Sequence, residues 1–201
     1  MYKMVAFIIT MIIVPSAFTA PTFQEGVNYE VRAKIGSAKP EVLVFFSYFC
    51  PGCAKIEPVI NELKNSLPEN VIFKKNHVAF LGRDMGPLMQ KAYATAYILK
   101  VDERMTSAIF QRMQQRQYPR DRSDVEKIFV ENGIPAESFD ATFDSFPVAS
   151  MVSQFNRNTD SYKIRAAPSF LINGKYMIKL ESISSQAQLN QLVSFLLVKN
   201  Y

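Results

Sequence analysis

The only two cysteines of this 201-residue chain lie in the stretch FFSYFCPGCAKIEP, residues 45–58. Spaced like this, Cys50 and Cys53 could form a small structural disulfide, supply half of a metal site, or cycle between dithiol and disulfide. A disulfide that closes so small a loop removes little chain entropy and would stabilise the fold weakly. A zinc site needs four ligands, but the chain offers only these two cysteines and one histidine, His77. The pattern therefore favours a redox pair and no metal.

The segments around the cysteines decide how the thiols would behave. Residues 42–47, VLVFFS, form a continuous apolar run that is typical of a strand buried on both faces. A helix should follow, with Pro51 in its first turn, where the missing amide is tolerated. Cys50 would then lie at a helix N-terminus, where free amides and the helix dipole stabilise a thiolate. We expect Cys50 to be the exposed attacking sulfur and Cys53, one turn further on, to be the shielded resolving sulfur.

The remaining pattern predicts the fold class. Residues 71–78 are expected to form a second strand, which gives a strand–helix–strand unit with the cysteines at its first junction. From about residue 86 to 162, apolar residues recur every three or four positions, Tyr97 and Phe146 among them, and indicate successive helices. Strand patterns return around the turn Asn173-Gly174, a strong hairpin signal. We predict an α/β protein whose mixed sheet carries an inserted α-helical subdomain.

Capping signals predict where some helices begin and end. Ser123 with Glu126 forms the sequence pattern of a capping box and predicts a helix start, and Asn132-Gly133 predicts the end of that helix. Ser185 with Gln188 repeats the capping-box pattern and predicts the start of a last helix.

The first twenty residues have the layout of a secretory signal peptide. Lys3 precedes an apolar run from Met4 to Val14, and small residues follow. This run of about 11 residues is well short of the roughly 20 that span a bilayer as a helix, so a membrane anchor is the weaker alternative. We therefore expect residues 1–20, with an approximate boundary, to direct export, and residues 21–201 to function outside the cytosol, where disulfides persist.

The charge is mildly positive, with 23 basic and 18 acidic residues and a formal net charge of +5. One segment concentrates arginine, and a solvated helix face explains it better than nucleic-acid binding, which calls for a denser basic patch in a recognisable module. These arginines are Arg104, Arg112, Arg116, Arg120 and Arg122.

Together these features resemble the DsbA family of thiol:disulfide oxidoreductases, the thioredoxin-fold oxidants of the bacterial periplasm. FFSYFCPGC is similar to the family's active-site strand and CPxC motif, NHVAF to its next strand, and RAAPSFLINGKY to its cis-proline loop and hairpin. The resemblance covers nearly all of residues 21–201. It implies a thioredoxin-like domain with a helical insertion at about 85–162.

The resemblance also implies roles for residues outside the CxxC motif. Pro168 would be a cis-proline that faces the cysteines, with the backbone of Ala167 presented to a substrate strand. The alternative is an ordinary proline at a strand entry. Glu57 and Lys75 match a buried acid and base that would handle the proton as Cys53 attacks. The alternative here is a surface ion pair.

Two positions depart from the family's pattern. Strongly oxidising members usually have histidine before the second cysteine, where this chain has Gly52, and the loss of that thiolate stabiliser predicts weaker oxidation. An acidic position on the preceding strand is Val44 here, which acts in the opposite direction. We expect the single histidine, His77, to be a structural residue within a strand and not a catalytic base. The chain has no GxSxG motif, so a serine-type triad has little support.

The resemblance implies a monomeric oxidase that donates the Cys50–Cys53 disulfide to reduced exported proteins and is reoxidised by a DsbB-type membrane protein. Its redox group would be this disulfide, with no other cofactor. One alternative is a reductase or isomerase on the same fold. Another is a holdase that binds unfolded exported chains without electron transfer.

Overall fold

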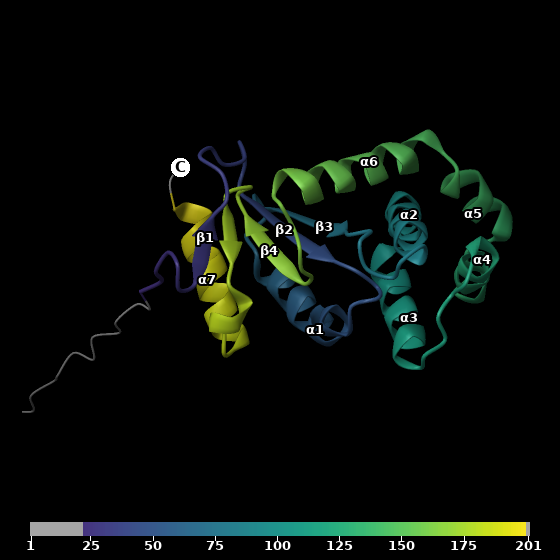
Figure 1. The fold of residues 1–201 in the computed structure, drawn as a ribbon, viewed down its shortest axis with the longest axis horizontal. Helices are drawn as coiled ribbons and strands as arrows, with labels where there is room; N and C mark the ends of the chain where they lie inside the picture. Colours follow the sequence, from purple (N-terminus) through teal and green to yellow (C-terminus); the bar gives the residue numbers. More distant parts are fainter. Residues whose placement is uncertain (1–21, 200–201) are drawn as a thin grey trace, which may run out of the picture.

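The computed structural model describes residues 22–199, so the expected signal peptide, residues 1–20, lies outside the described residues. Five strands form one sheet in the order β1-β5-β4-β2-β3, in which β2 and β3 are parallel and the other neighbours antiparallel (Figure 1). Within residues 22–199, no helix has both the length and the apolar content to span a bilayer. The strands are β1 (Tyr29–Val31), β2 (Glu41–Phe46), β3 (Ile72–His77), β4 (Ser169–Ile172) and β5 (Tyr176–Ile178).

Strand β2 lies between β4 and β3 and is buried on both faces, as its continuous apolar sequence predicts. Because side chains alternate along a strand, Val42 and Val44 point to one face and Leu43 and Phe45 to the other. The first pair packs in a core with helices α1 (Pro51–Ser66) and α7 (Gln186–Val198). The second pair packs in a separate core on the opposite face. The sheet is thus covered on both sides, and the C-terminal end of β2 leads directly to Cys50.

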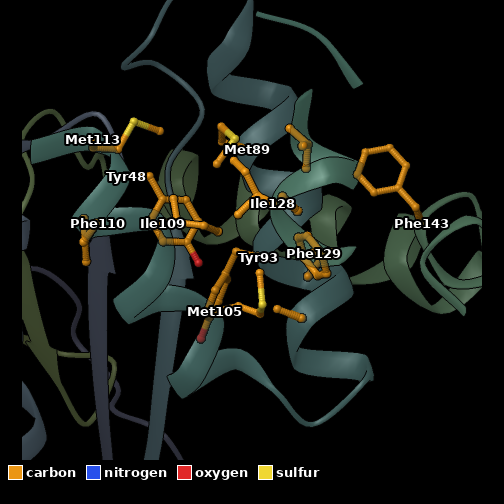
Figure 2. Packing of buried hydrophobic residues seen from close by; sticks show 14 of the residues in the cluster. Tyr48, Met89, Tyr93, Met105, Ile109, Phe110, Met113, Ile128, Phe129 and Phe143 are labelled. Atoms are coloured by element: carbon orange, nitrogen blue, oxygen red, sulfur yellow. The ribbon is translucent and has the colours of Figure 1, made fainter. Parts of the chain in front are cut away.

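Five helices lie between β3 and β4 and form the predicted insertion. Figure 1 shows them beside the sheet, with α6 running from α5 back towards the strands. Their methionine and aromatic side chains form one core, part of which Figure 2 shows. The prediction of an α/β fold with an inserted helical subdomain is confirmed. The helices are α2 (Met85–Ile98), α3 (Asp102–Gln114), α4 (Arg122–Glu131), α5 (Ala136–Phe143) and α6 (Phe146–Ser161).

The helix ends follow the capping signals in two cases and depart from them in one. Ser185 caps α7, because its hydroxyl accepts a hydrogen bond from the Gln188 amide at 3.2 Å. Gly133, at φ +79°, follows α4 as predicted. The predicted start of α4 at Ser123 is wrong, because Asp121 is the N-cap and its carboxylate accepts from the Asp124 amide at 2.9 Å. Aspartate is as good an N-cap residue as serine, so positions 121 and 123 both carry a preferred N-cap residue, and the capping-box pattern at Ser123 did not decide between them.

Two aromatic residues of the helical repeats are exposed. Tyr97 in the last turn of α2 is 48% exposed, and Phe146 in the first turn of α6 is 83% exposed. Both lie at helix ends. Periodicity shows which residues share a helix face but not how far along the helix that face is covered.

Candidate active site

Cys50 is the N-cap residue of α1, and Cys53 lies one turn inside the helix. The Cys50 Sγ accepts a hydrogen bond from the Cys53 amide at 3.2 Å, as the oxygen of a serine cap does. Pro51 occupies the first turn, where an amide would have no partner within the helix. The Cys50 sulfur therefore lies where the amides and the positive end of the helix dipole favour a negative charge.

The accessibility of the two cysteines differs less than the sequence indicated. Cys53 is fully buried, as expected, but Cys50 is only 8% exposed, so the prediction of an exposed sulfur is wrong in degree. The reason is a neighbour distant in sequence, because the Cys50 thiol donates to the Ala167 carbonyl oxygen at 3.1 Å. The expected order of access is kept, because Cys50 is the more exposed of the two residues.

The loop at Ala167 and Pro168 faces the cysteines across Gly52. The peptide bond between Ala167 and Pro168 is cis. A β carbon added at Gly52 would lie 3.6 Å from the Pro168 Cδ and 3.7 Å from the Cys50 Sγ. Gly52 thus lies between the attacking sulfur and the proline ring, in a gap that accepts a side chain at ordinary contact distances.

The surroundings of Cys53 favour its protonated form. Burial raises the pKa of the Cys53 thiol well above its ordinary value, and the hydrogen bond and charge of Cys50 raise it further. A hydrogen bond with the Ser47 backbone and the charge of Lys75 oppose this rise but are smaller. Two thiols three residues apart therefore lie in opposite environments, one at a helix terminus and one in an apolar interior.

Glu57 and Lys75 form a buried ion pair and not the surface pair considered as the alternative. The Lys75 Nζ lies 2.7 and 2.8 Å from the two carboxylate oxygens of Glu57. The Lys75 side chain is 9% exposed and the Glu57 side chain is 11% exposed. The Lys75 ammonium also lies 4.5 Å from the centre of the Phe46 ring. The charge of Lys75 lowers the pKa of Cys53, so the ion pair lies within electrostatic range of the Cys53 sulfur.

A hollow of about 230 Å³ connects this ion pair with more exposed groups. Glu57 and Lys75 line it together with Asp102, Lys64 and Glu103. The Lys64 and Glu103 side chains are largely in contact with solvent, whereas burial raises the pKa of Asp102. The hollow thus extends from the buried carboxylate of Glu57 to side chains that contact solvent.

His77 has the structural role that its position in a strand indicated. Its Nε2 accepts a hydrogen bond from the Tyr48 amide at 3.1 Å, and the residue is fully buried. Burial lowers the pKa of His77 to about 3, so the ring is neutral near pH 7. The bond joins β3 to the backbone just before Cys50, a role that no sequence motif indicated.

The sequence is similar to named disulfide-exchange proteins. Residues 41–194 match the model of the DSBA-like thioredoxin domain family. The thiol:disulfide interchange protein DsbA of Yersinia pestis is 33% identical over 197 residues, which cover 94% of this chain and 95% of the relative. Its counterpart in Escherichia coli K12 is 34% identical over 170 residues, covering 83% of this chain and 82% of the relative.

The fold is similar to solved structures as well. The disulfide oxidoreductase DsbA from Proteus mirabilis superposes with a TM-score of 0.82 at 33% identity, covering 89% of this chain and 98% of that one. A complex of the same relative with a non-covalently bound peptide gives a TM-score of 0.83 at 32% identity, covering 89% and 100%. Family match, sequence identity and fold agree, and the chain belongs to the DSBA-like thioredoxin domain family.

Proposed function

We propose that this thiol:disulfide oxidoreductase works as an oxidase that passes the Cys50–Cys53 disulfide to reduced exported proteins. One observation carries the proposal: the Cys50 sulfur caps α1 and contacts the carbonyl of Ala167, before the cis-proline. Placed there, the sulfur is stabilised when it leaves as a thiolate, so the disulfide is readily donated.

The reaction starts from the oxidised enzyme. A substrate thiolate attacks the Cys50 Sγ, forms a mixed disulfide and releases the Cys53 sulfur with its electron pair. A second substrate thiolate then attacks the substrate sulfur of the mixed disulfide and releases Cys50 as a thiolate. Two substrate thiols lose two electrons and form one disulfide, and the enzyme ends as the dithiol. In this scheme the extended backbone of Ala167 holds the substrate strand while the sulfurs align.

Glu57 and Lys75 handle the proton of Cys53 in this scheme. The released Cys53 sulfur lies in an apolar interior that raises its pKa, so it takes up a proton as it leaves. The nearby ion pair can supply that proton and recover it through the hollow beside Asp102. In reoxidation the same groups would accept the proton when Cys53 attacks a mixed disulfide on Cys50.

The partners and location belong to the same proposal. A peptide bound by the Proteus mirabilis relative supports peptide segments as substrates here. The signal-peptide pattern of residues 1–20 supports export to the periplasm, with reoxidation by a DsbB-type membrane protein. The enzyme would work as a monomer, with the disulfide as its only redox group.

Two cysteine variants test the mechanism. Cys50→Ala should abolish oxidation of a reduced model protein, because no sulfur remains that the substrate can reach. Cys53→Ala should accumulate mixed disulfides on Cys50, which non-reducing gels detect. Full activity of the first variant, or the absence of adducts on the second, would overturn the mechanism.

The direction of electron flow needs a separate measurement. Alkylation of free thiols in intact cells with a mass tag should find the pair mostly as disulfide, whereas a reductase would be held as the dithiol. Catalytic turnover on a reduced substrate excludes a holdase, which would bind stoichiometrically.

A further inference from the structure

A small hollow lies beside Cys50, separate from the cis-proline loop. It measures about 240 Å³ and is lined by Phe49, Cys50, Met113, Arg116 and Tyr118 among others, without a contribution from the loop that holds Pro168. The hollow is smaller than sites for drug-sized ligands, which suits one side chain. Because Cys50 is one of its lining residues, the hollow lies next to the point where a substrate cysteine would react.

The lining has the chemistry of an aromatic slot. The rings of Phe49 and Tyr118 stack with centroids 6.5 Å apart and planes 28° apart, and Tyr118 is 54% exposed. The Met113 thioether adds a polarisable wall of the kind that packs well against aromatic rings. The Phe49 ring packs against Gly82, where any β carbon would overlap it, so one side of the slot is fixed.

Arg116 is the one charged residue among those that line the hollow. Among the five clustered arginines, Arg112, Arg120 and Arg122 have acidic partners. Arg116 has none within residues 22–199. The apolar slot thus has a guanidinium at its rim that is free to pair with a carboxylate or to lie over an aromatic ring.

The end of α3 fixes where this arginine stands. Arg116 adopts φ +60°, and its amide and that of Gln117 bond to the carbonyls of Met113 and Arg112 at 3.0 Å each. This is a Schellman motif with arginine at the position where glycine is usual. Glycine can therefore replace Arg116 without backbone strain, which removes the charge and leaves the turn intact. Lys100 ends α2 in the same conformation, at φ +58°, and lies outside the hollow.

We propose that this hollow is a substrate subsite that selects an aromatic side chain within two residues of the substrate cysteine, with an acidic residue beside it paired to Arg116. The inference deepens the proposed oxidase function and rests on it. Two residues of extended chain span about 7 Å, which keeps the aromatic side chain within reach of a slot that Cys50 itself lines. Phe49, Met113 and Tyr118 hold the ring, and Arg116 sets the preferred charge.

The test uses the mature oxidised enzyme and synthetic heptapeptides with one central cysteine. At each of the four positions nearest the cysteine the peptide carries tyrosine or alanine, with aspartate or lysine next to it. The second-order rate of mixed-disulfide formation is measured by rapid alkylation and mass spectrometry. At one position we expect tyrosine to react about 3- to 10-fold faster than alanine, and aspartate about 2- to 5-fold faster than lysine.

Four variants assign these preferences to the slot. Tyr118→Ser should lose the preference for tyrosine, and Tyr97→Ser, which removes another exposed tyrosine, should keep it. Arg116→Gly should lose the preference for aspartate. Lys100→Gly should keep it, although it removes the same charge at an equivalent helix end.

The proposal is overturned if no flanking position shows a preference in the wild-type enzyme, or if the Tyr118 and Arg116 variants keep the wild-type ratios. Equal losses in the two control variants would also overturn it, because the effect would then be general. Each ratio compares two peptides on one variant, so a change in overall reactivity cancels. Failure of the wild-type enzyme to oxidise any thiol would count instead against the proposed function.

Discussion

Replacing Gly52 with histidine would test whether a thiolate at Cys50 sets the oxidising power. The gap at Gly52 accepts a β carbon at 3.6 Å from Pro168 and 3.7 Å from the Cys50 sulfur, both ordinary contact distances, so a side chain can begin there without moving the backbone. A protonated imidazole about 5 Å from a thiolate gains roughly 1–2 kcal/mol at an effective dielectric constant of about 40–80. This stabilises only the reduced enzyme. Since about 30 mV corresponds to 1.4 kcal/mol for two electrons, the reduction potential should rise by about 20–40 mV.

The assay is the redox equilibrium of the enzyme with glutathione, followed at pH 6, where an imidazole with the ordinary pKa of about 6.5 is mostly charged. Gly52→Gln is the matched control, because it adds a neutral side chain of similar size and removes the same glycine. Its potential should stay close to that of the wild type. The difference between the two variants should shrink by pH 8, where the imidazole is mostly neutral.

Two results would refute this reasoning. A histidine variant with the same potential as the wild type at pH 6 would mean that no thiolate at Cys50 responds to the added charge. A shift of equal size in both variants would assign the effect to the loss of glycine and not to electrostatics. In either case the position of Cys50 at the N-terminus of α1 would no longer explain the donation of its disulfide.

Three further tests, with four substitutions, address the groups around the site. Burial lowers the pKa of His77 to about 3, so between pH 7.5 and 5 the unfolded chain takes up a proton that the folded chain does not. The free energy of unfolding should therefore fall by about 2 kcal/mol over this range, and by much less in His77→Gln. Urea titrations at several pH values measure this free energy, and the same pH dependence in the wild type and the variant would contradict the prediction. Lys75→Met leaves the carboxylate of Glu57 buried without its partner and should lower the free energy of unfolding by about 3–5 kcal/mol, most of which the second change Glu57→Leu should restore. A double variant no more stable than Lys75→Met would show that the pair's charge is not the cause. Gly82→Ala should destabilise by about 1–3 kcal/mol, since Gly82 adopts φ +90° and its new methyl group would overlap Phe49; an unchanged melting temperature would count against this packing.

The elements next to the cysteines were predictable because their signals are local. The apolar run of β2 and the start of α1 are encoded by residues within a few positions of each other. Strand β1 was not predicted, since its three residues, Tyr29–Val31, are held by pairing with β5. Such a strand has too few residues to show a period, and its existence depends on a partner some 145 residues away in sequence.

The site shows the same division between local and distant causes. That Cys50 caps a helix could be inferred from the sequence order, but its low exposure could not, because the contact comes from Ala167. The hydrogen bond from the Tyr48 amide to His77 could not be predicted either, although the sequence shows that residue 77 is the only histidine. A lone histidine at the end of a strand, next to Val78, indicates a structural residue, and only the fold shows that its ring accepts a hydrogen bond from the Tyr48 amide.

The turn that carries Cys50 is held from two sides, and Tyr48 makes both connections. Its amide donates to His77 of β3 at 3.1 Å, and its hydroxyl lies 3.2 Å from the Thr106 hydroxyl of α3. Figure 2 shows its ring among the side chains of the helical core, and the ring centroids of Tyr48 and Phe110 are 5.3 Å apart. A sheet domain alone could supply only the first connection. The inserted helices therefore fix the position of the attacking sulfur and provide the wall of the hollow beside it, so a change in the packing of α3 should alter both the rate of thiol attack and the choice of substrate.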